Sequence, residues 1–129
     1  MYKCLSTNLI KPLTEPIYMK LDTKAVQKRV VKALNTFIKD KKEIKVKEQW
    51  FALKNPAFFA DIMELEGRYA VNVILQFLDT PQKPMVLFTI PIKVNETTFQ
   101  IGANEIKTQK EVEDTCEKAA LHFANLNFR

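Results

Sequence analysis

Two segments in the middle of the chain alternate apolar and polar side chains over a length typical of extended strands. These segments are residues 68–78 and 85–94, and a loop with two prolines separates them. A period of two places every second side chain on the same face of a sheet. The sequence therefore predicts two long strands, each with one buried face. The side chains expected on the buried faces are Tyr69, Val71, Val73, Leu75 and Phe77 in the first strand, and Val86, Phe88, Ile90, Ile92 and Val94 in the second.

Shorter extended segments flank these two strands. We expect strands at residues 17–21, 43–53, 58–65 and 97–101. The segment 58–65 is apolar on both faces, which favours a central position in the sheet. Glu66 and Gly67 predict a tight turn after it, because glycine adopts a positive φ at little steric cost. Pro91 lacks an amide donor, which indicates an edge or a bulge in the last long strand.

Two amphipathic helices enclose the predicted strands in the sequence. Residues 23–40 follow an N-cap at Asp22 or Thr23, and the final helix begins at Thr108 with Glu111 three residues later, which is the capping-box pattern. A period of 3.6 residues gives each helix one apolar face. The predicted buried residues are Val26, Val30, Ala33, Leu34 and Phe37 in the first helix, and Val112, Cys116, Ala119, Ala120, Phe123 and Leu126 in the last.

A run of strands between two helices predicts an α+β fold. We expect an antiparallel sheet of four or five strands with both helices packed on one face. The length of 129 residues suits one domain, which we place at residues 17–129. Residues 1–16, which Pro12 interrupts, are expected to form an irregular N-terminal arm.

The residues that carry catalysis or metal binding are sparse. Cys4 and Cys116 belong to no metal-binding spacing, and His122 has no nucleophile that the sequence pairs with it. Gly67 and Gly102 are the only glycines, which excludes a P-loop and a dinucleotide fingerprint. Glu64, Glu66 and Asp61 fit a solvated strand end. We expect no enzyme activity, no cofactor and no metal, and the absence of a secretory or membrane-spanning pattern favours a reducing, cytoplasmic setting.

Charge is distributed unevenly along the chain. Residues 1–55 contain thirteen Lys or Arg against five Asp or Glu, while residues 56–129 contain seven against ten. A basic segment attracts polyanions, and lysines next to aromatic rings are typical of sequence-tolerant binding to RNA or single-stranded DNA. Seventeen of the twenty basic residues are lysines, which favours phosphate contact over base readout. The predicted nucleic-acid site consists of Lys24, Lys28, Lys32, Lys39, Lys42, Lys45, Lys47, Trp50 and Lys54.

Two other functions remain open at this level. The chain is also consistent with a protein-interaction module, either a homodimer or an inhibitor of a larger partner, because Leu121 falls on the polar side of the last helix and the sheet is expected to have an open face and an edge strand. A carrier of a small apolar ligand is the third reading, with the rings of Tyr69, Phe77 and Phe88 lining a pocket.

Overall fold

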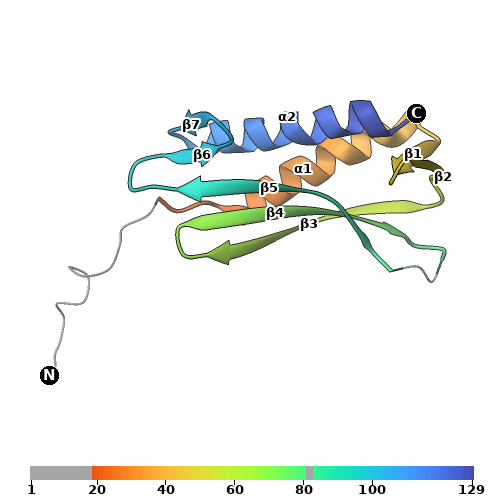
Figure 1. Cartoon of the computed structure of the whole chain (residues 1–129), viewed down its shortest axis with the longest axis horizontal. Coiled ribbons are helices and arrows are strands. Elements are labelled where there is room, and N and C mark those ends of the chain that lie inside the picture. Colours follow the sequence, from red (N-terminus) through yellow and green to blue (C-terminus); the bar gives the residue numbers. More distant parts are fainter. Residues whose placement is uncertain (1–18, 81–82) are drawn as a thin grey trace, which may run out of the picture.

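The computed structural model of the chain describes residues 19–80 and 83–129 (Figure 1). In these residues, two helices cover one face of a five-stranded antiparallel sheet, and a separate two-stranded sheet lies at one end. The predicted α+β fold is confirmed. The expected arm at residues 1–16, which includes Cys4, lies outside the described residues.

The main sheet follows the order of the chain. Its strands are β3 (Pro56–Leu65), β4 (Arg68–Phe77), β5 (Met85–Val94), β6 (Phe99–Ile101) and β7 (Asn104–Ile106). The turn between β3 and β4 uses Glu66 and Gly67, and Gly67 has a φ of 76°, as the sequence predicts. All five apolar side chains expected on the inner face of β4 are buried.

Both helices begin where their capping residues place them. The side chain of Asp22 accepts a hydrogen bond from the Ala25 N–H at the start of α1 (Thr23–Phe37), which a 3₁₀ turn extends over Ile38–Asp40. Thr108 accepts one from the Glu111 N–H at the start of α2 (Gln109–Asn127). These bonds satisfy amides that have no partner within the helix. The helices pack against each other and against the sheet through Val26, Val30, Leu34, Val112, Cys116, Ala120 and Ala124.

The segment expected as one strand at residues 43–53 is a hairpin. Strands β1 (Glu43–Val46) and β2 (Gln49–Ala52) are joined by Lys47 and Glu48, with φ values of 50° and 66°. Two positive φ values in a two-residue loop match the right-handed twist of a hairpin, a conformation that usually takes asparagine and glycine. The prediction was wrong here because neither residue type marks this turn.

The hairpin is attached to the end of the chain. Ile44 pairs with Phe128, and the Arg129 carbonyl oxygen accepts hydrogen bonds from the N–H groups of Lys42 and Glu43, at 2.8 and 2.9 Å. The side chain of Ile44 is fully buried. The last two residues of the chain therefore hold β1 at the end of the molecule where α1 and α2 finish.

Three further strand predictions differ from the structure. The segment 58–65 lies in β3, which is an edge strand and not a central one. Residues 19–21 are not in a strand, and the predicted strand 97–101 is shorter and is followed by an additional strand, β7, across a turn that contains Gly102 at a φ of 60°.

Two predicted core residues lie at the surface. Val86 is exposed because the pairing of β4 with β5 shifts between Val73 and Ile74, which reverses the alternation beyond that point. Leu126 is also exposed, and Ala124 takes the buried position in the last turns of α2. Pro91 lies near the end of β5, at a place where β6 has not yet begun to pair with it.

Candidate nucleic-acid interface

The outward face of α1 presents a row of lysines. Lys24, Lys28 and Lys32 are exposed on the helix, and Lys39 is exposed in the 3₁₀ turn that follows. At a rise of 1.5 Å per residue, the α-carbons of Lys24 and Lys39 are roughly 20 Å apart along the axis. The predicted lysine stripe is therefore accessible along the whole length of the helix.

The arginine of the same helix is used differently. Arg29 lies against α2, where it forms ion pairs with Glu113, Asp114 and Glu117 at 3.6, 2.5 and 2.5 Å. Three carboxylates on two neighbouring turns of α2 surround the fork of the guanidinium group. Arg29 therefore joins the two helices and is not available to an external anion.

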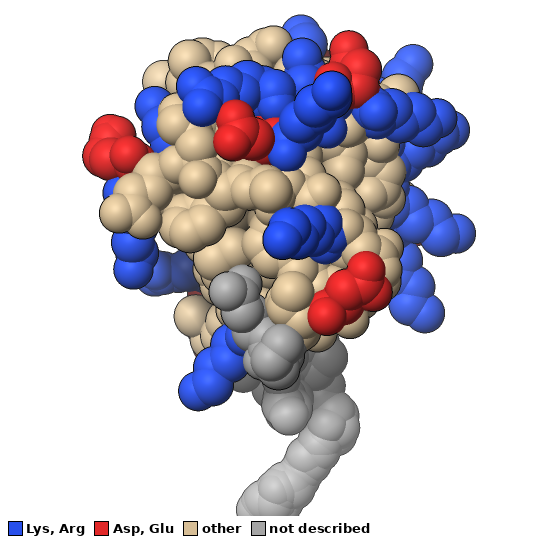
Figure 2. All heavy atoms as spheres, turned by 90° about the vertical axis from the view of Figure 1, so that its right-hand side faces the viewer, with Lys and Arg blue, Asp and Glu red and all other residues tan. Residues whose placement is uncertain are grey.

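The β1–β2 hairpin continues the basic surface. Lys42, Lys47 and Lys54 are exposed, and Lys45 is half-buried, with its amino group 6.0 Å from the centre of the Trp50 ring. Figure 2 shows this end of the molecule, where basic side chains spread over the upper part and one margin and acidic side chains are few among them. Within residues 19–80 and 83–129, the ion pairs are made by Arg29 and Arg129, and none of them uses a lysine.

Trp50 has a partner that the sequence did not reveal. The guanidinium carbon of Arg129 lies 3.9 Å from the centre of the indole ring, and Arg129 Nε donates to Glu43 Oε1 at 2.9 Å. A cation over an indole face is attracted by the electrons of the ring. Because 79 residues separate Trp50 from Arg129, only the pairing of the chain end with β1 brings them together.

The other aromatic side chains do not extend this platform. Phe51 is exposed but lies on the opposite face of β2 from Trp50, since neighbouring side chains alternate in a strand. Phe58 is buried in the core, and Phe59 is exposed on the outer face of the main sheet. Among the described residues, Lys45 lies beside Trp50 and Lys41 lies over the ring of Phe37, 5.0 Å from its centre.

The rings expected in an apolar pocket are not neighbours. Tyr69 and Phe77 are eight residues apart in β4, a separation of about 27 Å along a strand. Phe88 packs instead against Phe123, with ring centres 4.6 Å apart. The three rings therefore do not line a common cavity.

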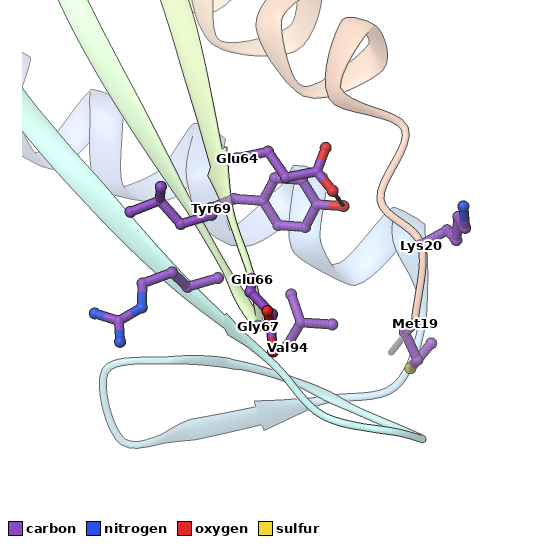
Figure 3. A pocket seen from close by; sticks show the side chains of 9 residues that line it. Met19, Lys20, Glu64, Glu66, Gly67, Tyr69 and Val94 are labelled. Carbon is purple, nitrogen blue, oxygen red and sulfur yellow. Dashed lines mark hydrogen bonds between the residues drawn. The ribbon is translucent and has the colours of Figure 1, made fainter. Parts of the chain in front are cut away.

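A small pocket of about 300 Å³ lies at the β3–β4 turn (Figure 3). The Tyr69 hydroxyl donates to Glu64 Oε2 at 3.4 Å inside it, while the Lys20 side chain points away from both. Burial raises the pKa of Tyr69 above its ordinary value, and the charge of Glu64 acts in the same direction. Tyr69 and Glu64 are opposite each other in the β3–β4 pair, and these groups do not converge on an empty position.

The remaining candidate residues are dispersed. Cys116 is fully buried between the helices, as predicted, and His122 is exposed on α2. Leu121 is half-buried in a shallow groove of about 520 Å³ between α1 and α2. The part of the chain that the structure describes contains no group of histidine, cysteine or acidic side chains able to hold a metal ion, and no helix long and apolar enough to cross a membrane.

Comparison of the chain with models of protein families, with curated proteins and with solved structures finds no match.

Proposed function

We propose that the protein binds RNA or single-stranded DNA, without sequence preference and without catalysis, through α1 and the β1–β2 hairpin. The observation that carries this proposal is that the arginine and lysine side chains have different partners. Between described residues, the arginines Arg29 and Arg129 pair with carboxylates, whereas the lysines of α1 and the hairpin form no ion pair. Unpaired ammonium groups are the ones that release counterions when they meet phosphates.

Lysine is suited to contact that ignores sequence. Its ammonium group is a compact charge on a flexible stem, so it follows a phosphate chain without reading base edges. The row from Lys24 to Lys39 and the hairpin residues Lys42, Lys45 and Lys47 supply such charges over one continuous stretch of the chain. A strand of nucleic acid laid along α1 would continue onto the hairpin.

Trp50 and Arg129 add a stacking element to this surface. Bases in a single strand stack on indole rings and on guanidinium planes, and each stacked base contributes about 1–3 kcal/mol. The indole and the guanidinium already stack on each other, 3.9 Å apart. A base added to the outer side of this pair needs to be unpaired, which favours a single strand over a duplex.

Charge reversal tests the proposal. In Lys47→Glu/Lys54→Glu an exposed lysine in the hairpin turn and one just after β2 become acids, and we expect fluorescence anisotropy to show weaker binding of labelled RNA and DNA single strands. Lys93→Glu/Lys118→Glu is the matched control, because it changes the net charge equally at two exposed lysines on β5 and α2, outside α1 and the hairpin. We expect that control to bind nearly as tightly as the wild type.

Two results would contradict the proposed site. Equal weakening by both double variants would mean that net charge alone, and not the hairpin, attracts the nucleic acid. Binding that neither variant changes would remove the lysines from the interface. Parallel titrations with RNA and with DNA of the same sequence show which of the two is preferred, because the 2′-hydroxyl is the group that distinguishes them.

A further inference from the structure

Strand β3 is the long free edge of the main sheet. It spans Pro56–Leu65 and pairs with β4 on one side, while no strand of the described residues lies beyond it (Figure 1). In an antiparallel pair, alternate residues point their N–H and C=O groups toward the neighbour. Leu65 faces Arg68 across the two-residue turn, and the Leu78 N–H donates to the Asn55 oxygen at 3.0 Å. The odd-numbered residues therefore bond to β4.

The even-numbered residues of β3 consequently direct their backbone groups outward. These residues are Phe58, Ala60, Ile62 and Glu64. One of these outward groups already has a partner in α1: Gln27 Nε2 donates to the Ala60 carbonyl oxygen at 2.7 Å. The row offers hydrogen bonds to another extended chain, and such a row is the usual template for strand addition.

The rest of the sheet is protected against strand addition in the usual ways. Strand β7, at the other edge, has three residues. Strand β5 carries Pro91 and a register shift along the part that β6 leaves unpaired. Short strands, proline, lysine and bulges all discourage edge pairing.

None of these protective features occurs within the length of β3. It has ten residues, pairs with β4 without a register shift, and contains no lysine and no proline after its first residue, Pro56, in a chain with seventeen lysines. Its outer-face side chains Phe59, Met63 and Leu65 are 47%, 53% and 59% exposed. An edge that is long, regular and apolar is a predicted pairing site.

We propose that two copies of this chain pair antiparallel along β3, with the two-fold axis at Ile62, so that their sheets join into one. This register matches outward backbone groups with outward groups: Ile62 pairs with the partner's Ile62, and Ala60 with the partner's Glu64. On the outer face it places Phe59 beside the partner's Leu65, twice by symmetry. A two-fold contact uses the same surface on both copies, which a single free edge supplies.

Charge disfavours two of the alternative registers of β3, and loss of apolar contact disfavours a third, in which the axis at Met63 would place Phe59 beside the partner's Gly67. Asp61 lies opposite the partner's Met63, and Glu64 lies opposite the partner's Ala60, so no carboxylate directly faces another. Moving the axis to Asp61 would place two aspartates face to face, and moving it to Glu64 would do the same with two glutamates. Like charges directly opposite each other destabilise a strand pair.

Sedimentation equilibrium over a range of protein concentrations tests the dimer. We expect a reversible dimer of the wild type with a dissociation constant in the micromolar range. Phe59→Lys and Leu65→Lys each remove two cross-strand apolar contacts per dimer, and each should raise that constant about tenfold or more. Val86→Lys is the matched control: Val86 is 62% exposed on the same face but lies on β5, which β4 separates from β3, so its variant should dimerise like the wild type.

Hydrogen exchange of the wild type gives a second readout that needs no variant. The outward amides of Ile62 and Glu64 should exchange more slowly as protein concentration rises, whereas the inward amide of Met63 should be protected at every concentration. A wild type that stays monomeric at high concentration would overturn the proposal. So would a dimer that Val86→Lys abolishes and the two β3 variants leave intact, because it would place the contact on β5 and not on β3.

Discussion

The buried thiol of Cys116 should make the protein lose stability in alkaline solution. The side chain is fully buried in the seam between α1 and α2. Burial raises the pKa of Cys116 from 9.0 to about 11, and the negative charge of Glu113 makes a smaller contribution in the same direction. The folded protein therefore keeps a proton that the unfolded chain releases as the pH rises.

The size and sign of the effect follow from linkage. A group whose pKa is raised on folding contributes its full stability below the unfolded pKa of 9.0 and loses it as the pH rises toward the folded value of about 11. Over this window, the free energy of unfolding should fall by about 1.4 kcal/mol per pH unit, or roughly 3 kcal/mol in all. The pKa of Tyr69 is also raised, so its hydroxyl adds a loss of the same sign above pH 10.

Urea unfolding at pH 8, 9, 10 and 11 measures this loss, and the variant Cys116→Ala isolates the share of the thiol. That variant should be less stable at pH 8, because it loses packing, but its stability should decline less steeply above pH 9. Val112→Ala is the matched control, since it removes buried methyl groups from the same helix and leaves the thiol in place. Parallel declines for the wild type and Cys116→Ala would refute the reasoning.

Three further predictions concern the hairpin and the helix seam. Ile44→Ala should lower the free energy of unfolding by about 2–5 kcal/mol in urea, because Ile44 is fully buried where the hairpin meets Phe128. Replacing Lys47 and Glu48 with asparagine and glycine should raise the thermal midpoint, because those residues adopt the observed positive φ values with less strain. Arg29→Gln should lower the thermal midpoint and leave single-strand binding by anisotropy almost unchanged, since Arg29 pairs with acids of α2.

Local patterns predicted much of this fold. The alternation in residues 68–77 correctly predicts every buried side chain of β4. One face of that strand meets the helices, and the period of two assigns every second side chain to that face. Asp22 and Thr108 mark the starts of both helices, since a side-chain oxygen at the N-cap acts on amides only three residues away. Exposure of the lysines on α1 follows in the same way from the apolar face opposite them.

Features that depend on distant parts of the chain were not predictable. The apolar outer face of β3 looks like the mark of a central strand, but it belongs to an edge whose outer face no described element covers. A register shift in the β4–β5 pair moves Val86 to the surface, and no residue type announces it. Contact between Arg129 and Trp50 depends on the pairing of Phe128 with Ile44.

Salt dependence of single-strand binding tests the central proposal most directly. If six lysines of α1 and the hairpin meet phosphates, the slope of log K against log salt should be about −4, and affinity should fall about 300-fold between 50 and 200 mM salt. Trp50 is the only tryptophan, so its fluorescence reports on the proposed site and should be quenched on binding. Absence of binding at 50 mM salt, or binding without a change in Trp50 fluorescence, would contradict the account.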